Sequence, residues 1–161
     1  MSVQLTVEQS VFLQGPVSIN VAATRHDGWP CVCRAQGCMV AHDRRTITVL
    51  LSARRGHAVL DALDTSSSIA AVFSRPATHA TLQFKSRHAA RVVLKAAHRA
   101  CATRYAQAFA GELVTLGYGP ELGQGLIAIM TTGDLIALRF VPEIVFDQTP
   151  GPAAGQVLAT A

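Results

Sequence analysis

The sequence predicts an α+β domain in which an antiparallel sheet of six to seven strands forms a small barrel with flanking helices. Segments typical of strands follow one another with short turns, whereas a doubly wound parallel sheet would alternate strands strictly with helices. The chain has 161 residues, the usual length of one domain, and no linker or internal repeat divides it. We therefore expect a single domain over 1–161 with its core over 11–155.

The first predicted elements are a short helix over 6–13 and a meander of three strands. Thr6 and Gln9 have the spacing of a capping box, and Gly15 with the following proline ends the helix. Apolar and β-branched residues then alternate or cluster as strands require. The three strands are expected over 17–22, 30–40 and 46–51. Gly37 indicates a bulge or a bend in the second of them.

The second half of the chain is predicted to contain three further helices and four further strands. A long alanine-rich helix is expected from His88 to about Ala110, because alanine has the highest helix propensity. The other helices are expected over 54–63 and 120–130. The strands are expected over 69–73, 80–84, 135–140 and 144–146. The tail over 149–155 is rich in Gly and Pro and is predicted to form turns.

Basic residues are concentrated in the middle of the chain. No Asp or Glu occurs from Thr65 to Gly111, while seven Lys or Arg residues do. Arg91, Lys95 and Arg99 recur every four residues and would share one face of the predicted long helix. Such a one-signed segment favours an anionic partner such as a phosphate, a nucleotide or nucleic acid, although a solvated helix face explains it equally well. Nucleic acid is the least favoured partner, because aromatic residues make up only 6% of the chain and none clusters with the basic run.

The composition also bears on assembly and location. Charged residues make up only 15% of the chain, against about 25% in an average soluble domain. A subunit interface would explain this low value, so we expect an oligomer. No apolar run reaches the length of a membrane span, and the N-terminus lacks a secretory pattern. We therefore expect a cytoplasmic protein with no membrane partner, whose four cysteines are reduced thiols.

Ser52, Arg54 and Arg55 form the first candidate site, where a strand leads into a predicted helix. Backbone N–H groups at a helix N-terminus attract anions, and a hydroxyl with two guanidinium groups would complete a phosphate site. The alternative is that Ser52 only caps the helix while the arginines are solvated.

Cysteines and histidines offer weaker candidates. Cys31, Cys33 and Cys38 lack the turn spacing of zinc ligands, so thiols are favoured over a metal site. His79 is the histidine expected to line a pocket, although a histidine bonded to the backbone is the more common case. The sequence contains none of the motifs GxGxxG, GxxxxGK[ST], GxSxG or HExxH.

The combination of segments TITVLLSARRG, IAAVFSRPATHATLQF and PEIVFDQTPGP resembles the pyridoxamine 5'-phosphate oxidase-like split β-barrels that bind flavin mononucleotide (FMN). The resemblance covers residues 11–155. It implies a homodimer with FMN bound at the subunit interface. By position, Arg34 would lie near the flavin ring, while Val49 and Leu50 would present backbone groups to it. The phosphate would be held by Ser52, Arg54 and Arg55, and further contacts would come from Thr81 and Gln83.

The chain also departs from the oxidase itself. Gly56 stands where the oxidase has a lysine, Asp147 stands where it has a tryptophan, and the tail over 151–155 lacks its charged substrate clamp. Oxidation of pyridoxamine phosphate is therefore not expected. The sequence leads to an FMN-dependent oxidoreductase of unknown substrate, with a nicotinamide, a deazaflavin or a quinone as redox partner. The alternatives are a non-enzymatic FMN module for storage or redox sensing, and a split barrel that binds another ligand such as heme.

Overall fold

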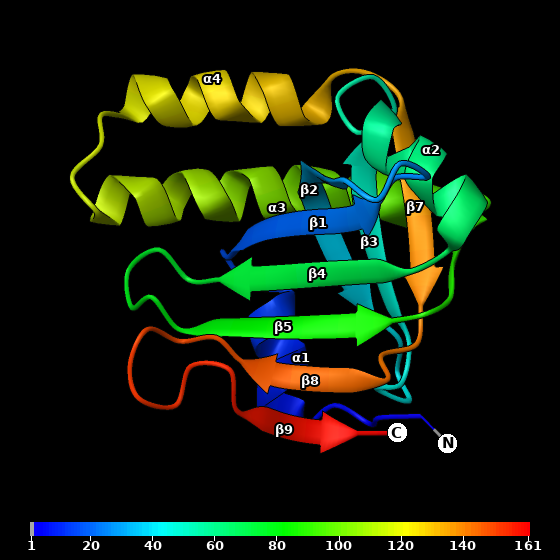
Figure 1. The fold of residues 1–161 in the computed structure, drawn as a ribbon. Coiled ribbons are helices and arrows are strands. Elements are labelled where there is room, and N and C mark those ends of the chain that lie inside the picture. Colours follow the sequence, from blue (N-terminus) through cyan, green and yellow to red (C-terminus); the bar gives the residue numbers. More distant parts are fainter. Residues whose placement is uncertain (1) are drawn as a thin grey trace.

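The computed structural model describes residues 2–161, and Figure 1 shows their arrangement. Within this range the chain forms four helices and one nine-stranded antiparallel sheet. The helices are α1 (Val7–Leu13), α2 (His57–Ser66), α3 (Ala96–Thr115) and α4 (Pro120–Thr131). The strands are β1 (Ser18–Thr24), β2 (Pro30–Val40), β3 (Ile47–Ser52), β4 (Ile69–Ser74), β5 (Thr81–Ser86), β6 (Ala89–Val92), β7 (Leu135–Phe140), β8 (Ile144–Asp147) and β9 (Val157–Thr160).

The sheet is curled but not closed, and its strand order is β6-β7-β3-β2-β1-β4-β5-β8-β9. Its inner face forms the main core, because every second residue of the strands points inward. Phe73 and Phe84 meet there edge to face, with 5.7 Å between their ring centroids. The predicted α+β class and antiparallel sheet are confirmed, whereas the predicted count of six to seven strands is too low.

The outer face of the sheet is covered on one half only. Figure 1 shows α3 and α4 side by side as a helical hairpin next to β1 and β2. The start of α3 covers β3 and β7, where it forms a second buried cluster with them that consists of Leu50, Cys101, Ala102, Leu135 and Ala137. The outer face of β1, β4, β5 and β8 carries no helix, so its side chains other than Thr81 remain partly or fully accessible.

Most of the elements predicted in the first half are confirmed. The capping box is present, since the Thr6 hydroxyl accepts a hydrogen bond from the Gln9 N–H and the Gln9 side chain accepts one from the Thr6 N–H. The predicted strand over 30–40 is β2. The predicted helix over 54–63 begins three residues later, because the chain first makes a turn after Ser52.

The predicted long helix over 88–110 is wrong at its start. Residues Ala89–Val92 form β6, which pairs with β7, and the Ala89 N–H donates to the carbonyl of Ser67. Pairing with an available sheet edge therefore overrides the helix propensity of the alanines. As a consequence, Arg91, Lys95 and Arg99 do not share one helix face: Arg91 lies on β6 and forms an ion pair with Asp64.

One further element, β9, was not predicted. The tail turns over 149–155 as predicted, but residues Val157–Thr160 then return as β9 against β8.

No helix within residues 2–161 has both the length and the apolar character needed to cross a membrane.

We predict that Gly37→Ala destabilises the protein, whereas Gly111→Ala stabilises it. Gly37 lies in the predicted bulge, where the register of β2 against β3 shifts, and it has a φ of +151°. A Cβ there would also lie 3.2 Å from Leu50 and 3.3 Å from the Cys101 sulfur. Gly111 lies inside α3 with open space around it, so alanine should add about 0.5–1 kcal/mol of stability there. Urea unfolding measures both changes, and equal effects at the two positions would contradict this assignment.

We also predict that the start of α3 loses stability as the pH falls below about 6.5. His98 is buried, and its Nδ1 accepts a hydrogen bond from the Lys95 N–H at 3.0 Å. Burial lowers the pKa of His98, and the charges of Lys95 and Arg139 act in the same direction. The unfolded chain therefore binds the proton more readily, so unfolding is favoured as the pH falls through the unfolded pKa.

The check is the free energy of unfolding at pH 7 and pH 5 for the wild type and for His98→Gln. The glutamine oxygen can accept the same hydrogen bond without titrating. The variant should lose part of the pH dependence, and an unchanged pH dependence would show that His98 is not its source.

Candidate functional site

The loop from Ser52 to Gly56 leads from β3 into α2 and forms the centre of the candidate site. The Ser52 hydroxyl accepts a hydrogen bond from the Arg55 N–H at 3.3 Å, and the Ser52 carbonyl accepts one from the Gly56 N–H at 2.8 Å. A Cβ on Gly56 would lie 2.9 Å from the Ser52 carbonyl oxygen and 3.3 Å from the Cys33 sulfur. The tight packing therefore requires glycine at position 56.

The N-terminus of α2 is open to an anion. Gly56 is its N-cap, and no side chain caps this end of the helix. The first N–H groups of a helix lack helical partners and carry a partial positive charge. Arg54 is exposed beside them, and within residues 2–161 its guanidinium group has no hydrogen-bond or ion-pair partner. This arrangement has the chemistry of a phosphate site.

Arg55 is held differently from Arg54. Its Nη2 donates to the carbonyl of Ile129, at the end of α4, at 2.6 Å. With the amide of Gln36 oriented to satisfy both of its ends, the same Nη2 donates to Gln36 at 2.7 Å, and Gln36 donates to the carbonyl of Met130 at 3.3 Å. Arg55 therefore ties the loop to β2 and to α4. Sequence reasoning missed Gln36, and its only sequence signal was its place next to the bulge at Gly37.

Arg34 lies on the outer face of β2, beside α3. Its guanidinium carbon lies 4.5 Å from the centre of the Phe109 ring, and Tyr105 stacks on Phe109 with 5.9 Å between centroids. The Tyr105 hydroxyl donates to the carbonyl of Val17, and burial raises the pKa of this hydroxyl. Arg34 is exposed, so one side of its guanidinium group faces solvent.

Thr81 and Gln83 lie on β5, away from the loop. The Thr81 hydroxyl lies 2.9 Å from the Ser74 hydroxyl and 2.9 Å from the His79 carbonyl, and Gln83 accepts a hydrogen bond from Gln148. Gln83 shares one cross-strand row with Arg34, because the intervening register partners are Val72 and Asn20. Three strand spacings separate the two, about 14 Å.

Val49 and Leu50 lie in the middle of the sheet. β3 pairs with β2 on one side and with β7 on the other, so most of its backbone N–H and C=O groups are already hydrogen-bonded within the sheet. Both side chains are fully buried. The structure therefore brings Ser52, Arg54 and Arg55 together, connects Arg55 to β2 through Gln36, and leaves the β5 residues apart within one copy of the chain.

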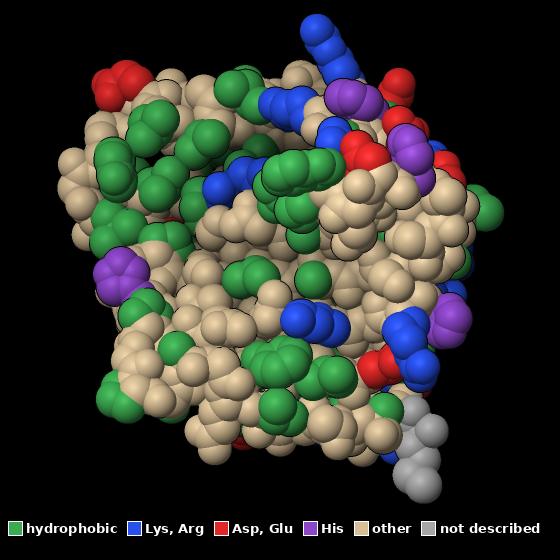
Figure 2. All heavy atoms as spheres, viewed as in Figure 1, with side chains coloured by type: hydrophobic (Ala, Val, Ile, Leu, Met, Phe, Trp, Pro, Cys, Tyr) green, Lys and Arg blue, Asp and Glu red, His purple; other side chains and the backbone are tan. Residues whose placement is uncertain are grey.

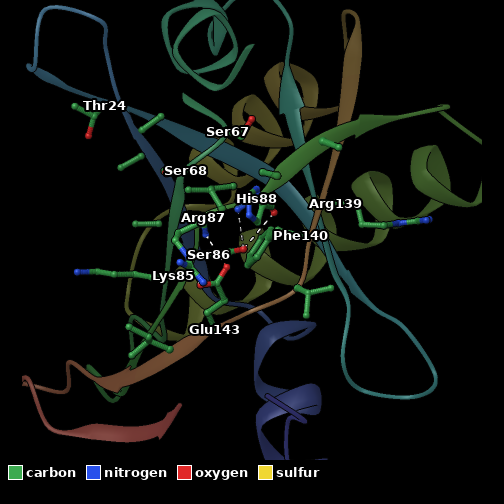
Figure 3. A pocket seen from close by; sticks show the side chains of 18 of the residues that line it. Thr24, Ser67, Ser68, Lys85, Ser86, Arg87, His88, Arg139, Phe140 and Glu143 are labelled. Atoms are coloured by element: carbon green, nitrogen blue, oxygen red, sulfur yellow. Dashed lines mark hydrogen bonds and ion pairs between the residues drawn. The ribbon is translucent and has the colours of Figure 1, made fainter. Parts of the chain in front are cut away.

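A separate cavity of about 1420 Å³ lies where β4 begins and where β5 and β7 end (Figure 3). None of the eight predicted site residues lines it. Ser86, Arg87, His88 and Glu143 gather near Phe140, whereas Lys85 and Arg139 point away from this group. Arg87 forms an ion pair with Glu143 at 2.7 Å. The charge of Arg87 is therefore neutralised by Glu143. The loop before α2, where Arg54 is exposed, is the more favourable place for an anion.

The remaining candidates lie elsewhere. Within residues 2–161 no three His, Cys, Asp or Glu side chains are grouped closely enough to hold a metal ion. His79 lies in the β4–β5 connection with a φ of +60°, and its N–H donates to the Arg75 carbonyl. Cys38 and Cys101 are buried against each other's elements, and the Cys101 thiol donates to the Cys38 carbonyl.

Comparison with known proteins identifies the fold. No protein-family model matches the chain, and no curated protein sequence matches it. Among solved structures, HupZ from Group A Streptococcus has a TM-score of 0.57 and 14% identity over 94% of this chain and 100% of that one. A candidate pyridoxamine 5'-phosphate oxidase from Lactobacillus delbrueckii has a TM-score of 0.54 and 15% identity over 89% and 93% of the two chains.

A third similar structure is a pyridoxamine 5'-phosphate oxidase-related, FMN-binding protein from Nostoc punctiforme. Its TM-score is 0.51, with 13% identity over 91% of this chain and 84% of that one. Together these structures show that the chain has the pyridoxamine 5'-phosphate oxidase-like fold that the sequence resemblance predicted. At such low identity the likeness establishes the fold alone.

We predict that Cys33 reacts slowly with alkylating reagents at pH 8. Burial, with a smaller contribution from Cys31, raises the pKa of the Cys33 thiol to about 11. Only the thiolate reacts, so labelling should be roughly 100-fold slower than for a free cysteine. Mass spectrometry after timed treatment with iodoacetamide measures the rate, and the urea-unfolded chain is the control. Labelling of the folded chain at the free-cysteine rate would contradict the predicted burial.

Proposed function

We propose that this protein is a cytoplasmic FMN-binding flavoprotein that acts as an oxidoreductase. The observation that carries the proposal is the N-terminus of α2, which no side chain caps and beside which Arg54 is exposed. This is the position to which the family resemblance assigns the FMN phosphate. The fold shared with an FMN-binding protein from Nostoc punctiforme supports the same reading.

Each part of the chain has a distinct task in this proposal. Bound FMN would supply the two-electron chemistry, so the protein needs no acid–base dyad of its own. The first N–H groups of α2, with Arg54 and the free donors of Arg55, would bind the phosphate. Arg34 would place its positive charge near the flavin ring, and the Phe109 ring beneath its guanidinium group limits how far that charge can move.

A second copy of the chain would complete the site. Apart from Arg34 and Asn20, the outer face of β1, β2 and β4 presents mainly small or apolar side chains, of which Val32 is 67% exposed. Figure 2 shows further hydrophobic side chains over the α3–α4 hairpin. A partner that covers this face would bury apolar surface and could bring its own Thr81 and Gln83 to the site. We therefore propose a homodimer with FMN between the subunits.

The substrate differs from that of the oxidase in this proposal. The tail over 151–155 is exposed, makes turns and contains no charged side chain. It offers no cation to a substrate phosphate. The electrons would come from a nicotinamide or another soluble redox partner.

The second candidate function is binding of heme in place of FMN. The cavity in Figure 3 favours it, since this cavity is large and His88 is among the residues that line it. A neutral imidazole is a common axial ligand of heme iron.

We predict that the purified protein binds FMN and that Arg54→Ala weakens this binding about tenfold. A charge-assisted hydrogen bond contributes about 1.5–3 kcal/mol, and about 1.4 kcal/mol corresponds to a factor of ten in Kd. Titration with FMN, followed by quenching of flavin fluorescence, measures the affinity. Bleaching by NADH or NADPH and recovery in air would then separate an enzyme from a binding module.

Arg99→Ala is the matched control, because Arg99 is also exposed but lies on α3 and not in the loop. Equal FMN affinities for the wild type and Arg54→Ala would contradict the assignment of the phosphate to this loop. The second candidate would be supported instead if the protein did not bind added FMN but gained a Soret band with hemin, and if His88→Ala lost that band.

A further inference from the structure

The C-terminal end of α4 depends on side chains from other parts of the chain. The last four carbonyl groups of a helix have no helical partners. In α4, Thr132 donates to the carbonyl of Ala128 from within the same segment. The next two carbonyls, of Ile129 and Met130, are reached by Arg55 and Gln36, which lie on the loop before α2 and on β2.

The side chain of Gln36 connects Arg55 to the C-terminal end of α4. It is 3% exposed, and each end of its amide has one partner: the oxygen accepts from Arg55 and the nitrogen donates to Met130. Its place beside the bulge turns it toward α4, because the register of β2 shifts between Ala35 and Cys38. A buried amide with both ends satisfied has one favoured orientation.

This connection determines which donors Arg55 can offer. Nη2 carries two hydrogens, and its two bonds go to Ile129 and Gln36. A guanidinium group has five N–H donors, so three remain on Nη1 and Nε. The group is planar, so fixing one nitrogen at two points also fixes the direction of the others. An arginine on an exposed loop would otherwise lose much side-chain entropy when it bound an anion.

We infer that Gln36 is the positioning residue of the phosphate site, and that it acts by holding Arg55 against the C-terminal end of α4. The inference rests on the proposed function, because it assigns a role toward the FMN phosphate. It also has a consequence for α4: since Arg55 serves both the phosphate and the helix end, binding of FMN and docking of α4 are coupled.

The test compares FMN with riboflavin, which lacks the phosphate. Gln36→Leu should weaken FMN binding about fivefold to tenfold, because Arg55 is no longer held in place before binding. Its affinity for riboflavin should stay unchanged, since Gln36 acts only through the phosphate contact. Gln124→Leu, the same substitution at an exposed position of α4, is the matched control and should change neither affinity.

A double-mutant cycle tests whether the effect passes through Arg55. In the background of Arg55→Ala, adding Gln36→Leu should have no further effect on FMN affinity. An equal loss of FMN and riboflavin affinity in Gln36→Leu would show a structural role only, and unchanged FMN affinity would overturn the inference directly.

Amide hydrogen exchange of α4 without any ligand keeps the inference separate from the proposed function. Gln36→Leu should increase exchange at the C-terminal end of α4, whereas Gln124→Leu should not. If the wild type fails to bind FMN, the proposed function is wrong, and hydrogen exchange alone then tests whether Gln36 and Arg55 stabilise the C-terminal end of α4. Unchanged exchange in Gln36→Leu would overturn this role of Gln36.

Discussion

The close approach of three backbone segments at Gly37 is the constraint on which the rest of the structure depends. At this point β2 bulges, and Leu50 of β3 meets Cys101 and Ala102 of α3 beside the Gly37 Cα. Glycine suits this position because its φ of +151° is one that L side chains rarely adopt and because a Cβ would crowd both neighbours. The bulge lets α3 lie on the sheet, and it also turns Gln36 toward α4 and Arg55. The main helical layer and the candidate site therefore share one local cause.

The uneven covering of the sheet determines where a ligand can bind. α3 buries the outer face of β3 and β7, whereas the outer face of β1, β4 and β5 has no helix over it. Arg34 and the loop before α2 lie at the boundary between these two halves. A ligand at this boundary would rest on rigid, covered strands on one side. On the other side it would meet whatever covers the open half, which in the proposed homodimer is the second subunit.

The basic middle of the chain illustrates how a sequence pattern can be redistributed by folding. Arg87 pairs with Glu143, Arg91 pairs with Asp64, and Lys85 lies 5.0 Å from the centre of the Phe146 ring. The acidic partners lie 56 and 27 residues away along the chain, so folding pairs two of the seven basic residues of this run with acids from outside it. Exposed ion pairs of this kind contribute little stability, but they reduce the attraction of this surface for anions.

The sequence by itself determined the local elements whose signals are local. The Thr6 capping box, the bulge at Gly37 and the strand over 30–40 follow from the conformational preferences of residues next to one another. The resemblance in sequence also predicted the fold, which the solved structures support. The loop of Ser52, Arg54 and Arg55 was found because a strand, a hydroxyl and a helix start are adjacent in sequence. Only the tertiary structure decided that Ala89–Val92 is a strand and that Gln36 holds Arg55. The strand depends on β7, 45 or more residues away along the chain, and Arg55 depends on Gln36, 19 residues away, and on Ile129, 74 residues away; no local propensity encodes such contacts.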